Sequence, residues 1–138
     1  MIRSPSILTI TALLGLAGCD GIPQAEKEAP ALTRSASCQV GGDDVYGRPD
    51  RTPVATIAMN NDGGWCWMNS TESQWGRVYG PWLTVLRQPE FGTLKIDVTE
   101  ANTRVAYRPN PGFVGTDTFK TRSRELNYDV EYRVVVTK

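Results

Sequence analysis

The chain has 138 residues, with 15 Lys and Arg against 15 Asp and Glu, no histidine and three cysteines. This length accommodates one ordinary domain, and a formal net charge of +0 gives no reason to expect binding to nucleic acid or to an anionic membrane surface. Without histidine the chain cannot form a Ser-His-Asp or Cys-His catalytic site, or a histidine-ligated metal centre.

Residues 1–18 read as a secretory signal peptide. Arg3 is followed by an uncharged apolar run over 7–18. As a helix this run would span about 18 Å, too short for a hydrocarbon core of about 30 Å, so it is not expected to persist as a transmembrane anchor.

The end of this segment, Leu16-Ala17-Gly18-Cys19, resembles the lipobox of bacterial lipoproteins. The resemblance implies cleavage before Cys19, a diacylglyceryl thioether on its thiol, and amide acylation, for example by palmitate, of the new terminus. Two or more acyl chains give stable membrane anchoring. The alternative is an ordinary secreted protein whose signal peptide happens to end near a cysteine. No cofactor is expected apart from this covalent lipid.

Residues 19–37 are rich in Ala, Pro, Glu and Ser and contain few large apolar side chains, so we expect a lipidated terminus followed by a disordered tether. Asp20 resembles the signal that retains lipoproteins at the inner membrane of enteric bacteria. The sequence therefore predicts a lipid-anchored protein of the bacterial cell envelope, facing the periplasm, with the inner membrane weakly favoured.

With Cys19 lipidated, Cys38 and Cys66 remain as an even pair in an oxidising compartment, which favours a disulfide bond. Closing the intervening loop of about 29 residues is worth on the order of 3–4 kcal/mol by the chain-entropy estimate. Their wide separation does not resemble a redox-active Cys-x-x-Cys pair.

From residue 38 onward, short runs of alternating apolar and polar residues are separated by turn residues, and no long helical period occurs. In the last run Val130, Tyr132, Val134 and Val136 share one face. We expect an all-β domain over 38–138, an antiparallel immunoglobulin-like sandwich of about seven strands. The expected strands are 53–59, 65–69, 82–88, 93–98, 104–108, 116–124 and 129–136, with 70–81 as a connecting segment.

Residues 84–138 resemble the bacterial cadherin-like or Ig-like extracellular repeats. The resemblance rests on TVLRQPEFGTLKI, VAYRPNPGFVGTDTF and the closing VEYRVVV. It implies a spacer or adhesion module without catalytic residues. We expect Phe113 to plug one end of the sandwich and the carboxylate of Asp117 to accept backbone N–H groups at that corner.

Four tryptophans, Trp65, Trp67, Trp75 and Trp82, are the best functional lead. Indole faces stack on sugar rings, so exposed tryptophans on a β-sandwich suit a reader of glycan or peptidoglycan. In an extended strand Trp65 and Trp67 share one face and Cys66 points to the other, which places both indoles outward if Cys66 joins the disulfide. The alternative is that they cover the core, as a tryptophan does beside the disulfide of antibody-type domains.

Other charged groups offer weaker candidates. Asp43, Asp44, Asp50 and Asp62 do not have the spacing of an EF-hand, so no metal site is expected. Arginines and carboxylates interleave on the later strands, which cross-strand pairing explains, although an acidic partner surface is a second interpretation. The arginine and lysine positions are Arg104, Arg108, Lys120, Arg122, Arg124 and Arg133.

The sequence therefore predicts a non-enzymatic envelope lipoprotein whose single domain is a binding or interaction module. The alternative is a structural accessory subunit that docks on an envelope protein complex and binds no small ligand.

Overall fold

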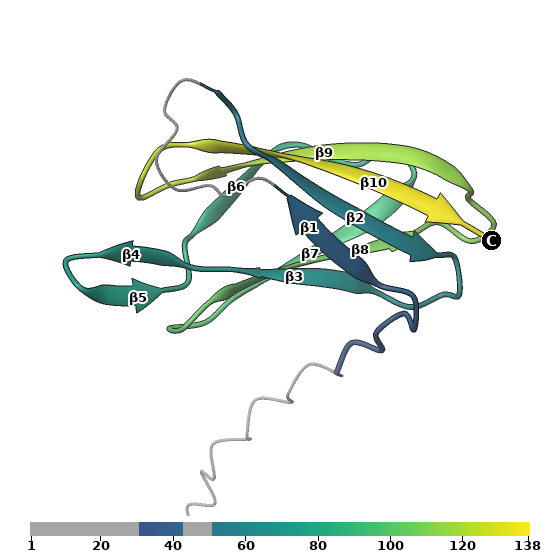
Figure 1. The fold of residues 1–138 in the computed structure, drawn as a ribbon, viewed down its shortest axis with the longest axis horizontal. Coiled ribbons are helices and arrows are strands. Elements are labelled where there is room, and N and C mark those ends of the chain that lie inside the picture. The colour runs from purple at the N-terminus through teal and green to yellow at the C-terminus, as the bar shows by residue number, and fades with distance from the viewer. Residues whose placement is uncertain (1–30, 43–50) are drawn as a thin grey trace, which may run out of the picture. The chain divides into compact units, whose positions relative to one another are not determined.

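The computed structural model describes residues 31–42 and 51–138 of the chain. Within them the chain forms ten β-strands and no helix, which confirms the predicted all-β class (Figure 1). The predicted signal peptide, the lipid-attachment residue Cys19 and the first part of the predicted tether lie outside the described residues.

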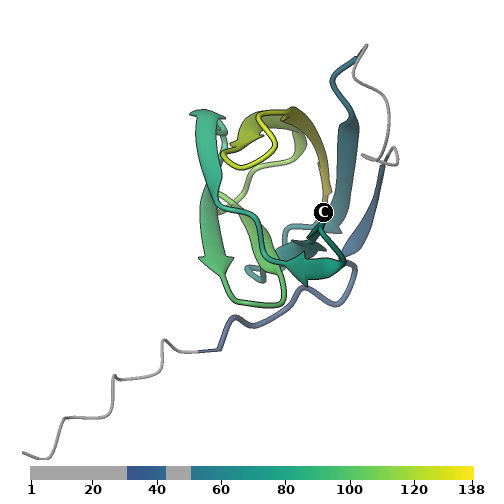
Figure 2. The same cartoon turned by 90° about the vertical axis from the view of Figure 1, so that its left-hand side faces the viewer.

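The larger sheet has five strands in the order β1-β2-β10-β9-β6. The bounds of its strands are Gln39–Gly42 (β1), Val54–Asn60 (β2), Leu83–Arg87 (β6), Gly115–Ser123 (β9) and Asp129–Thr137 (β10). The smaller sheet has three strands in the order β3-β8-β7, bounded by Cys66–Ser70 (β3), Thr103–Pro109 (β8) and Gly92–Val98 (β7). Seen end-on in Figure 2, the strands surround the interior of the domain, and buried hydrophobic side chains form its core. All seven predicted strands are present, and the arrangement is sandwich-like.

The expectation of purely antiparallel sheets is wrong at one pair. β10 runs parallel to β2, with Glu131 opposite Val54 and Thr137 opposite Asn60. A parallel pair needs a long connection between its strands. Here the connection is nearly the whole domain, because strands β3 to β9 all lie between β2 and β10 in the sequence.

The segment 70–81 is a β-hairpin, where we expected only a connection. β4 (Glu72–Gln74) and β5 (Arg77–Tyr79) form a separate two-stranded sheet, drawn at the left of Figure 1. Trp75 and Gly76 make its turn, both with positive φ (56° and 75°). Tight hairpin turns require such angles, and a bulky side chain adopts them at a cost, which is why the sequence did not indicate a turn here.

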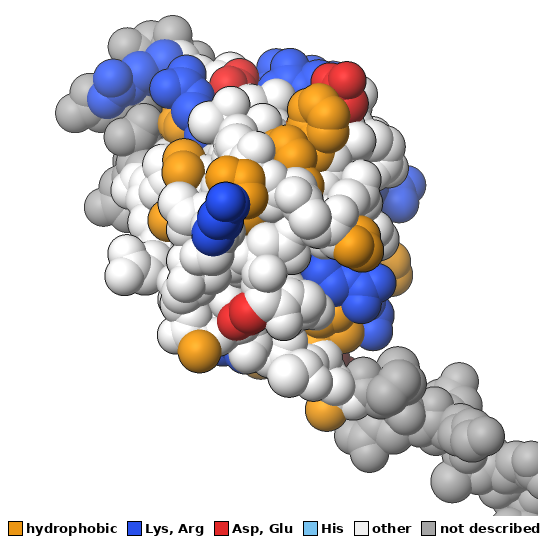
Figure 3. All heavy atoms as spheres, turned by 90° about the vertical axis from the view of Figure 1, so that its right-hand side faces the viewer, with side chains coloured by type: hydrophobic (Ala, Val, Ile, Leu, Met, Phe, Trp, Pro, Cys, Tyr) orange, Lys and Arg blue, Asp and Glu red, His pale blue; other side chains and the backbone are white. Residues whose placement is uncertain are grey.

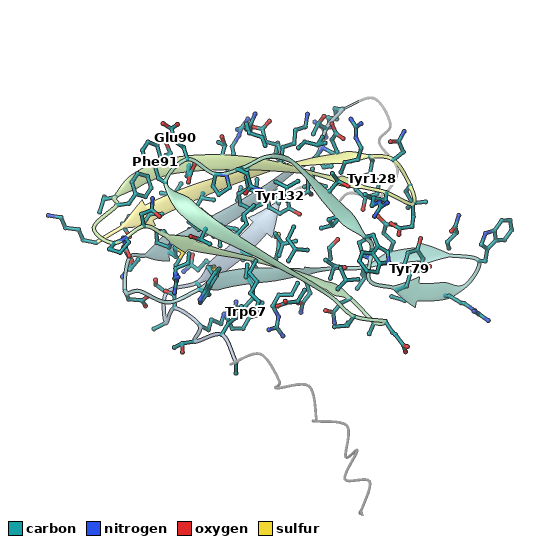
Figure 4. All side chains as sticks on the ribbon, turned by 180° about the vertical axis from the view of Figure 1, so that it is seen from behind. Trp67, Tyr79, Glu90, Phe91, Tyr128 and Tyr132 are labelled. Atoms are coloured by element: carbon teal, nitrogen blue, oxygen red, sulfur yellow. A yellow bond between two sulfur atoms is a disulfide. The ribbon has the colours of Figure 1, made fainter. Side chains whose placement is uncertain are left out.

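The core is built from alternate residues of the long strands. The predicted inward residues Val130, Tyr132, Val134 and Val136 are all buried. Stacked aromatic rings join the two sheets: Tyr132 packs on Phe119 with ring centroids 4.3 Å apart, and Phe119 lies 6.2 Å from Tyr107. Figure 4 shows Tyr132 between the sheets. The predicted Cys38–Cys66 disulfide is present, with an S–S distance of 2.07 Å, and Cys66 is fully buried.

One corner of the sandwich is closed as the C-terminal motif predicted. The buried carboxylate of Asp117 accepts hydrogen bonds from the backbone N–H groups of Glu90, Phe91 and Thr118. Phe113 packs against the core and stacks on Phe91, with ring centroids 4.7 Å apart.

Residues just before the expected domain start at residue 38 pair with the chain next to β3. A bridge pairs Arg34 with Trp65, since Trp65 N–H donates to Thr33 O and Ser35 N–H donates to Trp65 O. Ser35 is buried and its hydroxyl donates to the carboxylate of Asp62. The end of the predicted tether is thus an added edge segment beside β3.

Candidate functional site

The outer face of the smaller sheet carries Trp65 and Trp67. Because Cys66 points into the core to its disulfide, the tryptophans on either side of it point outward. Both are half-buried, and neither belongs to the hydrophobic core. Figure 4 shows Trp67 on the side of β3 that faces away from the sandwich interior.

Guanidinium groups lie over both indoles. Arg108 lies 4.7 Å from the ring centroid of Trp65, while Arg34 and Arg104 lie 4.7 Å and 5.1 Å from that of Trp67. All three distances fall within the roughly 6 Å over which a cation is attracted to an aromatic ring. We call these five residues the tryptophan–arginine face.

Strand register explains this arrangement. Trp67 is opposite Ala106 on β8, whose small side chain on the same outer face is fully buried. Arg104 and Arg108 lie two positions before and after Ala106, so both point to this face. Arg34 enters from the opposite edge through its bridge to Trp65.

The described part of this face has an excess of positive charge. Lys95 on β7 is opposite Ala106, and Asp97 is opposite Arg104. Asp97 is the one carboxylate among these outer-face positions, and its contact with Lys95 is long, at 3.9 Å. The buried Nε of Arg104 has no hydrogen-bond partner among the described residues. The face is therefore both aromatic and cationic.

A groove of about 440 Å³ adjoins the tryptophan–arginine face at Arg108. Its polar lining includes Asn61 and Thr93. Asn61 is held in place because its amide donates to the carbonyls of Asn110 and Phe113. Figure 3 shows this end of the domain, where basic, acidic and hydrophobic side chains are interspersed.

The other two predicted tryptophans do not join this face. Trp75 is at the tip of the β4–β5 hairpin and is 93% exposed, whereas Trp82 precedes β6 and is 58% exposed. Trp82 lines a second groove with Tyr79 and Gln74 at the base of the hairpin. The four tryptophans that are close in sequence are thus distributed over both ends of β3.

Of the four acidic candidates for a metal site, the structure describes only Asp62. Asp43, Asp44 and Asp50 lie outside the described residues. The carboxylate of Asp62 accepts hydrogen bonds from Gly64 N–H, the Ser35 hydroxyl and Ala36 N–H, and these bonds lower its pKa. Across residues 31–42 and 51–138, no group of three or more His, Cys, Asp or Glu side chains is placed to hold a metal ion.

The basic residues of the later strands separate onto two sheets. On the larger sheet Asp129 pairs with Lys120 at 3.1 Å and with Arg122 at 2.6 Å, and Glu131 contacts Arg133 at 3.5 Å. The hydrogen bond from Arg122, with smaller help from Lys120, lowers the pKa of Asp129. The pairs of Asp129 join β10 to β9 and agree with the structural interpretation, whereas Glu131 and Arg133 both belong to β10. Arg104 and Arg108 instead belong to the tryptophan–arginine face.

Sequence reasoning missed Arg34 and Glu72. Arg34 lies in the segment that we expected to be a tether, and it reaches the site because it pairs with Trp65 in a β-bridge. Glu72 lies in the expected connection, yet it is 1% exposed. No local signal in the sequence indicates its burial, and in the structure it lies opposite Tyr79 in the hairpin.

No protein-family model, curated protein or solved structure matches this chain. The described residues contain no helix with the length and apolar character needed to cross a membrane.

Proposed function

We propose that this protein is a non-catalytic binding module of the bacterial cell envelope, and that its ligand surface is the tryptophan–arginine face. The observation that carries the proposal is that Trp65 and Trp67 lie outside the core, beneath guanidinium groups. An indole that only filled space would be equally well placed in the interior, where it would bury more apolar area.

The chemistry of the face favours an anionic glycan over a neutral one. Indoles suit the apolar faces of sugar rings, and guanidinium groups donate paired hydrogen bonds to carboxylates. Because arginines cover the ring faces, a carboxylate that attracts them would also expose the indoles to the sugar. Peptidoglycan, which carries both sugars and carboxylates, is the ligand class that we propose.

The membrane anchor is the second part of the proposal. The lipobox at Leu16–Cys19 supports lipidation of Cys19, retention at a membrane that faces the periplasm and, through Asp20, the inner membrane. The C-terminal cadherin-like or Ig-like motif supports a role in interaction rather than catalysis. Oxidising conditions in this compartment agree with the Cys38–Cys66 disulfide.

Co-sedimentation of the detergent-purified protein with insoluble peptidoglycan tests the ligand. We expect Trp67→Ala to weaken binding at least fivefold, and raising the salt concentration to about 0.5 M to weaken wild-type binding, since charge attraction is screened. Trp75→Ala is the matched control because this tryptophan lies on the hairpin. Equal binding by wild type and Trp67→Ala at the same melting temperature would refute the proposed surface.

A docking subunit is the second candidate, and the exposed apolar side chains around the hairpin favour it. Trp75, Val78 and Trp82 are 93%, 62% and 58% exposed. Large exposed aromatics are typical anchors of protein interfaces. Affinity capture from solubilised envelopes distinguishes the two: docking predicts one stoichiometric protein partner that is lost in Trp75→Ala, whereas a glycan reader retains wall polymer in that variant.

A further inference from the structure

The groove at the base of the β4–β5 hairpin is separate from the tryptophan–arginine face. It has a volume of about 590 Å³ and combines two aromatic rings with two carboxylates. Its lining is Gln74, Tyr79, Gly80, Trp82, Val98, Thr99, Glu100 and Glu125. None of these described lining residues is basic. On the hairpin, Arg77 lies opposite Gln74, next to the turn.

A buried carboxylate lies behind the wall of this groove. Glu72 is opposite Tyr79 in the hairpin and is 1% exposed. The Tyr79 hydroxyl donates to its Oε2 at 3.3 Å, while Oε1 has no hydrogen-bond partner among the described residues. Burying a carboxylate without a full set of partners is costly, so a positive charge in the adjoining groove would stabilise it.

The phenol of Tyr79 connects this carboxylate to the groove. Desolvation raises the pKa of Tyr79, and the negative charges of Glu72 and Glu125 raise it further. The phenol therefore stays protonated and continues to donate to Glu72. Figure 4 shows Tyr79 at the root of the hairpin, where the groove opens.

One of the two groove carboxylates, that of Glu125, is fixed beside Trp82. Glu125 Oε2 accepts a hydrogen bond from Trp82 N–H at 3.1 Å, and the neighbouring Arg124 N–H donates to Trp82 O at 2.9 Å. These bonds hold the end of β9 and the start of β6 together. They keep a negative charge next to an indole that is 58% exposed.

We propose that this groove binds a primary ammonium group, such as that of a lysine side chain or an amino sugar. The rings of Trp82 and Tyr79 attract a cation through their faces, and Glu100, Glu125 and the buried Glu72 supply the negative charge. A compact ammonium on an alkyl chain also suits a groove whose wall mixes Val98 and aromatic carbon with carboxylates. The proposal does not depend on the ligand of the tryptophan–arginine face.

Titration of ¹⁵N-labelled, detergent-solubilised full-length protein with N-acetyl-lysine-N-methylamide tests it by NMR. We expect saturable shifts of the Trp82 indole N–H and the Gly80 amide. N-acetyl-norleucine-N-methylamide, which lacks the charge, is the ligand control. A second titration compares glucosamine, which carries an ammonium group, with N-acetylglucosamine, which does not. Stronger binding of the lysine derivative or of glucosamine identifies the source of the ammonium group.

Variants make the test specific to the groove. Glu125→Gln should weaken binding of the lysine derivative at least fivefold, and Glu100→Gln provides a second exposed position if the first alters folding. Glu131→Gln, a carboxylate on the larger sheet, should leave binding unchanged. Three results would each overturn the proposal. They are equal shifts with the norleucine derivative, no saturable shift with either amine, and unchanged affinity in both groove variants.

Discussion

The hydrogen bonds that converge on Asp117 allow a quantitative prediction about stability. This side chain belongs to a residue that is only 5% exposed. Its Oδ1 accepts from Glu90 N–H at 3.0 Å and Thr118 N–H at 2.8 Å, and its Oδ2 accepts from Phe91 N–H and the Tyr107 hydroxyl, both at 2.9 Å. Two of these donors come from the turn before β7, so the carboxylate ties that turn to β8 and β9.

Two substitutions remove different parts of this network. Tyr107→Phe deletes one hydrogen bond to a charged group, and we expect it to lower the free energy of unfolding by about 1.5–3 kcal/mol. Asp117→Asn keeps one oxygen but turns an NH₂ group toward the N–H of Phe91, which leaves a buried donor unsatisfied. We expect a loss of about 3–5 kcal/mol for this change, a large share of the ~5–15 kcal/mol of a typical domain.

Urea unfolding followed by tryptophan fluorescence measures both losses. For a domain of this size each kcal/mol corresponds to about 4–8 °C in Tm, so the two variants should separate clearly in a thermal scan. Asp97→Asn is the control, because its long contact with Lys95 at the surface should contribute less than about 1 kcal/mol. A loss in Asp117→Asn no larger than in Asp97→Asn would refute the reasoning, as would additive losses in the Tyr107→Phe, Asp117→Asn double variant.

Three further predictions concern the disulfide, acid stability and the anchor. Replacing both Cys38 and Cys66 by serine should cost about 3–4 kcal/mol in urea unfolding, and an unchanged midpoint would contradict a structural role for the bond. Because the pKa of Asp129 is lowered in the folded state, its ionised form contributes stability above about pH 4, and this stability is lost as the pH falls through the folded pKa. Arg122→Gln should therefore reduce the loss of unfolding free energy over this pH range. The same acid dependence in wild type and variant would show that the pair has no effect. Cys19→Ser should abolish fatty-acid labelling and move the protein out of the membrane fraction, whereas equal labelling of the variant would reject the anchor.

Much of the architecture was predictable because it follows from the local alternation of apolar and polar residues or from the number of cysteines. Alternation in 130–136 identified the buried face of β10, since side chains of a strand alternate with period two whatever its neighbours are. The same rule placed Trp65 and Trp67 on one face of the strand and Cys66 on the other. The disulfide followed from the even number of cysteines that remain once Cys19 is assigned to the lipid.

Only the tertiary structure decided how these strands combine. Alternation does not specify a partner, so the parallel pairing of β10 with β2 could not be read from either strand alone. Nor does it show that Arg34 returns to the edge of β3, or that Arg104 and Arg108 fall beside the indoles. Cation–aromatic contacts depend on register between segments far apart in sequence. The burial of Glu72 also came only from the structure, in which the hairpin places it opposite Tyr79. A period of two reveals which side chains share a face, whereas long-range pairing determines what those side chains meet there.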